Sequence, residues 1–360
     1  MNFKNKFDRA VVDDAIEKGI QYLLSVRVNG RWRGFSTLAG ESDIWVTGFV
    51  LAQIQHLCKQ ADDIKQSQNF LLTSVHSSGG WSYSNLVPPD ADSTAYCLMA
   101  LKTCTGFTGL ALQKAKRFLW SHFTDKGVST YKTDSGIREF ISAPNNQAIA
   151  GWTSTHPDVS IAAVLADLQH EKAAEIINWL IELQTKEGFI NSYWWRGSLY
   201  TTTLLLRTLS MYQQHLPQER ATMITGALVR EQLAHGGFSL AASTTGDPFT
   251  TALALESFTH LLYLGYDGQR TNCGNALLLL QQENGSWAGD FILRIPAPDT
   301  MDLNTVASWN NADGGGNSFI EDKEGLFATA MSCHALHCWR QSQTQNNLPA
   351  KWTEFPFIKS

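Results

Sequence analysis

The segment Gln281-Gln282-Glu283-Asn284-Gly285-Ser286-Trp287 carries the clearest information about the fold. A glutamine, a glycine four residues later and an aromatic residue two further on recur from Gln232 to Phe238, and degenerate copies surround Gly188, Gly79 and Gly30. Repetition of this kind indicates a chain built from similar structural units. The glutamine can bond backbone groups of its loop while the ring covers a helix end, so we expect the segment to be structural rather than catalytic.

Six units follow this plan, each with a helix of mixed polarity, a loop and a more apolar helix that opens with Ser or Thr. The opening residues are Thr47, Thr94, Ser160, Thr202, Thr251 and Thr329. A helix with one apolar face belongs on the outside of a helical assembly, and a helix that is apolar on most faces belongs inside. The repeats therefore predict an all-α fold, an (α/α)6 toroid of six helix pairs with Gln-Trp-like loops, as one domain over residues 1–360.

The predicted toroid has one functional end. Its inner helices run parallel, so six helix N-termini face the same mouth, where they favour an anion such as a diphosphate. Two long connections, 125–156 and 288–322, also lie at this mouth. Loops of this length are often lids, and their aromatic content supports that interpretation: Tyr131, Phe140, Trp152, Phe291, Trp309 and Phe319.

Composition excludes several classes of protein. The chain has 360 residues, 43% of them hydrophobic, and a formal net charge of -5 without any basic run, which argues against a nucleic-acid partner. No apolar run approaches the roughly 18 residues that a membrane span needs, and the first residues do not resemble a secretory signal. The six cysteines are scattered, mostly within helical patterns, as is typical of reduced thiols. We expect a soluble cytoplasmic protein.

Two carboxylates stand at the start of the second inner helix, Asp90 and Asp92. Asp90 lies four residues before its Thr, as Asp43 and Asp247 do in their own repeats, so a helix N-cap is a competing interpretation for it. A recurrent cap does not explain Asp92, which only Asp158 matches in position. The helix dipole lowers the pKa of a carboxyl in the first turn, whereas apolar surroundings and the neighbouring charge raise it. The pair can therefore hold a proton between its carboxylates.

With prolines before it, the sequence Asp90-Ala91-Asp92-Ser93-Thr94-Ala95 resembles the Asp-x-Asp-Asp and Asp-x-Asp-Thr-Thr motifs of class II terpene cyclases. The Gln-Trp loops resemble those of squalene-hopene cyclase, and the segments 192–202 and 285–290 look like the β domain of bacterial diterpene cyclases. The single barrel is closest in plan to drimane-type sesquiterpene cyclases. The resemblance implies that Asp92 is the general acid that protonates a prenyl alkene, supported by Asp90, Ser93 and Thr94. Ser93 replaces the family's last aspartate.

The implied reaction needs a dry cavity whose aromatic faces stabilise carbocations. The candidate rings on inner helices and mouth loops are Trp45, Tyr96, Trp194, Trp195, Tyr200, Phe249 and Phe327. Plain core packing is the competing interpretation for each of them. Typical bacterial members carry a second barrel, for which this chain has no room, so the resemblance favours farnesyl or geranylgeranyl diphosphate, cyclised with the diphosphate retained.

Five basic residues lie near the predicted mouth: Arg33, Lys132, Arg138, Arg196 and Arg294. We expect Arg196 to contact the diphosphate, because it follows Trp195 and leads into an inner helix. The acidic cluster from Glu321 to Glu324 opens the last inner helix and could hold Mg²⁺ with the diphosphate. We expect no organic cofactor and no resident metal.

Two other functions remain open from the sequence. Protein prenyltransferase β subunits share the toroid and use a zinc site of Asp, Cys and His; here Cys333 and His337 lie at i, i+4 on one helical face but lack a carboxylate at the right step. A non-catalytic interaction module with the same helical plan is the second alternative. The sequence also allows a partner protein that closes the barrel mouth.

Overall fold

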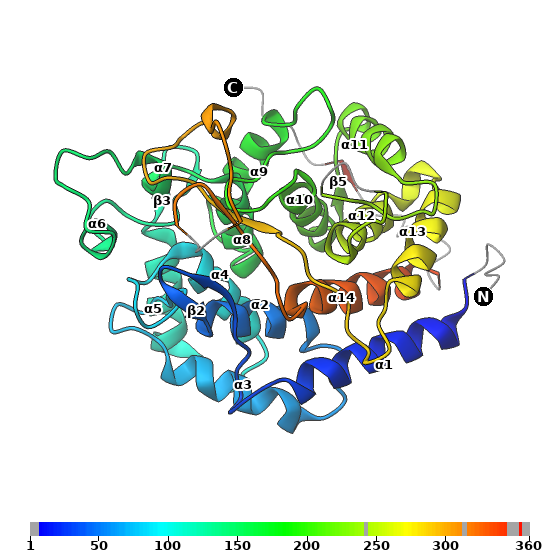
Figure 1. Cartoon of the computed structure of the whole chain (residues 1–360), viewed down its shortest axis with the longest axis horizontal. Helices are drawn as coiled ribbons and strands as arrows, with labels where there is room; N and C mark the ends of the chain where they lie inside the picture. Colours follow the sequence, from blue (N-terminus) through cyan, green and yellow to red (C-terminus); the bar gives the residue numbers. More distant parts are fainter. Residues whose placement is uncertain (1–6, 241–243, 312–314, 344–352, 355–360) are drawn as a thin grey trace.

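The computed structural model describes residues 7–240, 244–311, 315–343 and 353–354. Helices alternate along the chain between an outer and an inner ring (Figure 1). The outer helices are α1 (Arg9–Ser25), α3 (Ala61–Thr73), α5 (Gly109–Trp120), α9 (Ala173–Glu182), α11 (Gln218–Glu231) and α13 (Asp267–Leu279). The inner helices are α2 (Ile44–Ile54), α4 (Ala91–Ala100), α8 (Pro157–Ala166), α10 (Leu199–Met211), α12 (Pro248–His260) and α14 (Leu326–Ser342).

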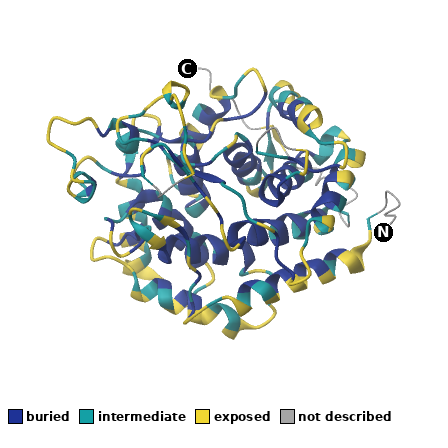
Figure 2. Ribbon diagram, viewed as in Figure 1, coloured by how far each residue is buried: buried dark blue, intermediate teal, exposed yellow. Residues whose placement is uncertain are grey.

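The inner ring is closed. Each inner helix packs against the next one along the chain, and α14 packs against α2. The outer helices α3, α5, α9 and α13 pack against the inner helix that precedes each of them, while α1 packs against α14. Inner helices are buried on almost every face, and outer helices expose their outward residues (Figure 2). The predicted toroid of six helix pairs is therefore confirmed, although a single domain over residues 1–360 extends into termini outside the described residues and stays a prediction.

The Gln-Trp loops join neighbouring outer helices. The Gln281 side-chain amide donates to the carbonyl of Gly285 in its own loop, at 2.9 Å, and to the carbonyl of Ala15 in α1, at 2.8 Å. Gln184 and Gln232 make the same pair of bonds, each to its own loop and to the following outer helix. Gly285 has a φ of 89°, and a Cβ there would lie 2.6 Å from the backbone oxygen of Lys18. These contacts agree with a structural part for the loops.

The Ser or Thr that opens each inner helix makes one recurrent hydrogen bond. Its hydroxyl accepts the backbone N–H of the preceding loop, at 2.7–3.0 Å, in all six units. The six pairs are Thr47 with Trp32, Thr94 with Trp81, Ser160 with Val128, Thr202 with Ile190, Thr251 with Phe238 and Thr329 with Trp287. The bond fixes the loop against the start of the inner helix.

Short elements occur in the connections. Three strand pairs are antiparallel: β1 (Gly34–Thr37) with β2 (Gly40–Ser42), β3 (Phe123–Thr124) with β4 (Gly127–Val128), and β6 (Leu293–Ile295) with β7 (Ser318–Ile320). A fourth pair, β5 (Gln214–His215) with β8 (Thr353–Glu354), is parallel. The long loops contain helices α6 (Ile137–Phe140) and α7 (Ala150–Thr153) and the 3₁₀ turn η2 (Leu303–Thr305); a second 3₁₀ turn, η1 (Leu262–Leu264), follows α12.

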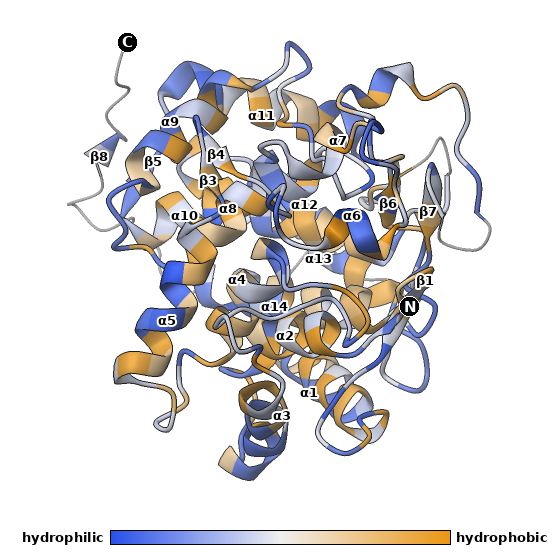
Figure 3. Cartoon of the chain, turned by 90° about the vertical axis from the view of Figure 1, so that its left-hand side faces the viewer, coloured by the Kyte–Doolittle hydropathy of each residue, from blue (hydrophilic) through white to orange (hydrophobic). Residues whose placement is uncertain are grey.

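Figure 3 looks onto the side that carries α6 and shows polar residues on α3 and α5 around the apolar inner helices. None of the helices in the described part of the chain combines the length and the apolar character that a bilayer crossing needs.

Candidate active site

A cavity of about 400 Å³ lies at the mouth of the barrel. Its walls come from the starts of α2 and α4, the loop before α10, the β1–β2 hairpin and both long mouth loops. Seven large rings line it: Trp45, Tyr83, Tyr131, Phe140, Trp152, Trp194 and Trp195. Aliphatic side chains of the mouth loops complete the wall, including Ile137, Ile141, Ile295 and Ile320. Both long loops therefore contribute to the wall. Of the six aromatic residues named in them, three line the cavity (Tyr131, Phe140 and Trp152) and three do not (Phe291, Trp309 and Phe319).

Asp92 presents its carboxyl to this cavity from the first turn of α4. It keeps partial exposure because it borders the cavity, while its neighbours along the helix are buried. Its Oδ2 atom accepts a hydrogen bond from the indole Nε1 of Trp45 at 2.8 Å. Burial raises the pKa of Asp92 well above its usual value, and the nearby carboxylates of Asp90 and Asp158 raise it further, against the opposing bond from Trp45. These effects favour the protonated form of the carboxyl, which is the form that can donate a proton.

Asp90 is both a helix cap and a cavity residue. Its Oδ1 accepts the backbone N–H of Ser93 at 2.7 Å, and its Oδ2 accepts the hydroxyl of the same serine at 2.7 Å. Burial raises the pKa of Asp90 to about 7 despite these hydrogen bonds. The two interpretations from the sequence are thus compatible, because the cap holds the second carboxyl beside Asp92.

The resemblance implied that Ser93 and Thr94 support the acid, but both of their hydroxyls donate to Asp90 and not to Asp92. Ser93 lines the cavity, but its hydroxyl donates to Asp90. Thr94 does not line the cavity; it donates to the backbone oxygen of Asp90 at 2.6 Å and accepts from Trp81, which are the contacts of the repeat. The structure therefore groups Thr94 with the other five opening residues.

The seven candidate rings divide into two sets. Trp45, Trp194 and Trp195 line the cavity. The other four, which the sequence also placed at the substrate, are buried and do not line it: Tyr96, Tyr200, Phe249 and Phe327.

These four rings, together with Phe49, form a stacked layer against the cavity wall, which we call the aromatic layer. Trp195 stacks on Tyr200 with ring centroids 3.7 Å apart, and Phe49 stacks on Phe327 at 3.6 Å. The hydroxyls of Tyr96 and Tyr200 are hydrogen-bonded to each other. Core packing is the better interpretation for this set.

Asp158, the positional match of Asp92, does not line the cavity. Its carboxylate accepts the backbone N–H groups of Tyr193 at 3.2 Å and Trp194 at 2.8 Å. The Trp194 indole in turn donates to the hydroxyl of Thr130 at 2.7 Å, which is bonded to His156 at 2.8 Å. Asp158 thus holds part of the cavity wall in place.

Arg294 is the one cationic side chain among the described residues that line the cavity. It donates from Nε to the carbonyl of Tyr193 at 2.9 Å and from Nη2 to the carbonyl of Ser192, and its guanidinium lies 5.9 Å from the ring of Trp309. Arg196, which the sequence favoured, does not line the cavity; it lies over Phe319 at 4.3 Å. The sequence had named both arginines and favoured the wrong one for the cavity.

In the acidic cluster that opens α14, the carboxylate of Asp322 is already hydrogen-bonded to the protein backbone. Both oxygens of Asp322 accept backbone N–H groups at 2.9 Å, from Leu326, Phe327 and Ala328. Burial raises the pKa of this carboxyl to about 7. A buried carboxyl that caps a helix in this way is a poor ligand for a Mg²⁺ ion at the mouth.

Sequence reasoning missed several lining residues. Tyr83 and the hairpin residues Thr37, Leu38 and Ala39 line the cavity without any repeated motif to mark them. Tyr83 lies two residues after the loop tryptophan Trp81. Alignment of the six units would have shown an aromatic residue at this position that the other units lack.

Comparisons with known proteins agree with this geometry. A family model described as the prenyltransferase alpha-alpha toroid domain matches residues 16–164, 158–263 and 192–346. Type II terpene cyclase MstE from Scytonema, in complex with geranylgeranyl dihydroxybenzoate, its substrate, has 25% sequence identity and a TM-score of 0.84 over 93% of this chain and 99% of that one. The apo form of MstE gives 26% identity and a TM-score of 0.83, with coverage of 91% and 98%.

A protein from Actinoplanes is also similar, with 27% identity and a TM-score of 0.81 over 92% of this chain and 99% of that one. No curated protein matches the chain. The family match spans most of the sequence, and the MstE structures share the whole toroid. The non-catalytic alternative is set aside, because a neutral carboxyl in an aromatic cavity is what alkene protonation requires. The chain belongs to the prenyltransferase alpha-alpha toroid domain family and, within it, is a type II terpene cyclase that starts its reaction by protonation.

Proposed function

We propose that this cyclase acts on a linear farnesyl or geranylgeranyl chain with an anionic head group, and that Asp92 protonates its terminal alkene. The observation that carries the proposal is the position of the Asp92 carboxyl, whose pKa is raised by burial, in a cavity lined by seven large rings. Aromatic and aliphatic side chains make up most of its wall, and such a cavity suits an apolar chain that reacts through cations.

The hydrogen bond from Trp45 assigns the two oxygens of the acid. Since Oδ2 accepts the indole N–H, the acidic proton resides on Oδ1. Transfer of that proton to the alkene forms a C–H bond from the π electrons and leaves a tertiary cation, which the next double bond attacks. Asp92 becomes a carboxylate that Trp45 stabilises. Each aromatic face within reach of the cation contributes about 0.5–2 kcal/mol.

The head group fits a carboxylate near Arg294. The bonds of this arginine to two backbone carbonyls leave Nη1 without a partner among the described residues, and a guanidinium binds carboxylates with good geometry. One arginine balances one negative charge, whereas a diphosphate carries more. The substrate of MstE is geranylgeranyl dihydroxybenzoate. We therefore favour a prenylated aromatic acid over the diphosphate that the sequence suggested, and with it the need for Mg²⁺ disappears.

The test is to incubate the protein with geranylgeranyl dihydroxybenzoate and, separately, with farnesyl and geranylgeranyl diphosphate followed by phosphatase. Cyclic products are then identified by mass spectrometry. Asp92→Asn should lower turnover by at least about 1,000-fold, because it removes the general acid. The control is Asp247→Asn, which makes the same Asp-to-Asn change at the N-cap of α12, outside the cavity.

Two results would contradict the proposal in different ways. Parent-like turnover by Asp92→Asn would refute the acid assignment. Turnover of the diphosphates alone would leave the acid assignment intact and refute the prenylated aromatic acid.

A further inference from the structure

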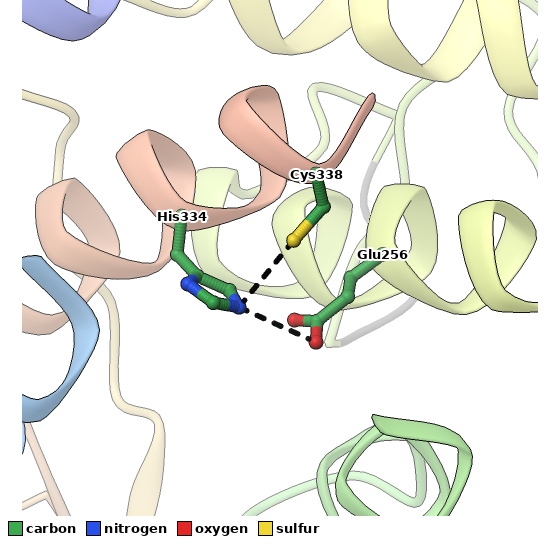
Figure 4. Close-up of side chains that lie close together, drawn as sticks. All are labelled: Glu256, His334 and Cys338. Carbon is green, nitrogen blue, oxygen red and sulfur yellow. Dashed lines mark hydrogen bonds and ion pairs between the residues drawn. The ribbon is translucent and has the colours of Figure 1, made fainter. Parts of the chain in front are cut away.

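A second cluster of reactive side chains lies deeper in the barrel, away from the mouth. Glu256 of α12 points toward His334 and Cys338 of α14 (Figure 4). Asp92 is the second residue of α4, whereas Glu256 and His334 are the ninth residues of their helices. Because the inner helices run parallel, seven residues at 1.5 Å each place this cluster roughly 10 Å further from the mouth. The aromatic layer lies between, so the cluster is not part of the cyclisation site.

We propose that Glu256, His334 and Cys338 form a binding site for one Zn²⁺ ion. The Nε2 atom of His334 is 3.5 Å from the sulfur of Cys338 and 3.6 Å from Oε1 of Glu256. All three candidate ligand atoms lie within 4.8 Å of one another. Zinc bonds of about 2.0–2.3 Å place tetrahedral ligands roughly 3.3–3.7 Å apart, so the two distances from His334 match a zinc site.

The ligand set also suits zinc chemically. One carboxylate oxygen, one imidazole nitrogen and one thiolate sulfur are a combination that zinc accepts and that hard cations such as Mg²⁺ do not. Three protein ligands leave the fourth position for water. Binding deprotonates the Cys338 thiol, and the carboxylate and thiolate together balance the charge of the ion.

Neighbouring side chains hold the ligands without excluding the metal. Arg207 bonds both oxygens of Glu256, at 2.6 and 2.8 Å, and also the side chain of Gln53 at 3.1 Å. Oε1 accepts from Arg207 and also lies 3.2 Å from Nε2 of His260, whereas Oε2 is bonded only to Arg207 among the described residues and keeps a lone pair for the ion. Hydrogen bonds of this kind commonly orient ligating carboxylates. Nδ1 of His334 is buried without a partner among the described residues, and Nε2 is the ring nitrogen that faces Cys338 and Glu256.

The sequence had pointed to a different pair in the same helix. Cys333 is buried, with its sulfur 3.8 Å from the carbonyl of Ile16 in α1, and His337 is bonded to Arg340 at 2.7 Å. The pair one residue along, His334 and Cys338, has the same i, i+4 spacing and faces α12, which supplies the carboxylate. A bound ion would join α12 to α14 and stabilise the fold.

The experiment uses the full chain, stripped of metal with a chelator and then titrated with Zn²⁺ alone by calorimetry. We expect one Zn²⁺ per chain and a higher melting temperature. Titration with Co²⁺ should give a thiolate-to-cobalt charge-transfer absorption. Cys338→Ser should abolish that absorption and weaken Zn²⁺ binding by more than about 100-fold. Cys104→Ser, which alters a partly buried thiol outside the cluster, is the matched control.

Absence of stoichiometric Zn²⁺ binding by the parent protein would overturn the site, as would unchanged binding by Cys338→Ser. His334→Gln provides a second ligand deletion, and far-ultraviolet circular dichroism confirms that each variant is folded before titration. Asp92→Asn should still bind zinc, and the stripped parent should still cyclise its substrate. The zinc site and the proposed function therefore fail or stand separately.

Discussion

Replacing Trp45 by phenylalanine tests how the protein controls its acid. Trp45→Phe keeps an aromatic face at the cavity but removes the N–H that lies 2.8 Å from Oδ2 of Asp92. This bond is worth most after proton transfer, when Asp92 carries the negative charge. The variant should therefore lose transition-state stabilisation while substrate binding changes little.

The expected size follows from the charge of the acceptor. A hydrogen bond to a charged group contributes about 1.5–3 kcal/mol, and each 1.36 kcal/mol corresponds to about tenfold in rate. We therefore expect kcat to fall by about 10- to 150-fold. The pKa of Asp92 should rise further, because Trp45 is the contact that favours its ionised form.

The assay is single-turnover cyclisation of the accepted substrate, with products separated by chromatography. Trp120→Phe is the matched control, because Trp120 donates to the carboxylate of Asp167 at 3.1 Å and lies outside the cavity. A Trp45→Phe kcat within about twofold of the parent value would refute the argument that this indole stabilises the conjugate base.

Four further substitutions test the acid, the head-group contact and the repeated hydrogen bond of the fold. Asp90→Asn removes the like charge that helps to hold the proton on Asp92, so the pKa of Asp92 should fall and the loss of kcat at high pH should begin at a lower pH; an unshifted profile would contradict the coupling. Arg294→Gln should raise KM for a carboxylated substrate by about 10- to 100-fold, since charged hydrogen bonds are lost, and an unchanged KM would place the head group elsewhere. Thr94→Val should cost about 1–3 kcal/mol in denaturant unfolding, as should Thr329→Val, because each leaves a loop N–H unpaired. If Thr94→Val lost cyclisation while Thr329→Val kept it, the Thr94 hydroxyl would have a role in the reaction and not only in the fold.

Much of the fold follows from local patterns. The spacing from Gln281 to Trp287 marks a loop whose glutamine bonds its own loop backbone and the next outer helix. The loops of Gln184 and Gln232 make the same pair of bonds. The Ser or Thr at each inner helix marks the same hydrogen bond six times. Because each unit uses the same contacts with its neighbours, counting units was enough to predict a closed ring.

The residue proposed as the acid, Asp92, could also be singled out from the sequence, whereas its surroundings could not. Asp92 stood out because a recurrent cap could not explain it, and the parallel inner helices placed it at the mouth. The choice between Arg196 and Arg294 depended on how the loop before α10 meets β6, about a hundred residues away in the chain. No local pattern records such a contact.

The sequence also could not predict which aromatic rings line the cavity and which are buried in the core. Trp195 and Tyr200 are close in sequence and stack at 3.7 Å, yet one borders the cavity and the other lies in the aromatic layer. The amino-acid order determined the six helix pairs and the position of the acid, because repeated short-range contacts encode both. Only the tertiary structure decided which rings and which arginine reach the cavity, because side chains from separate units and two distant loops close it together.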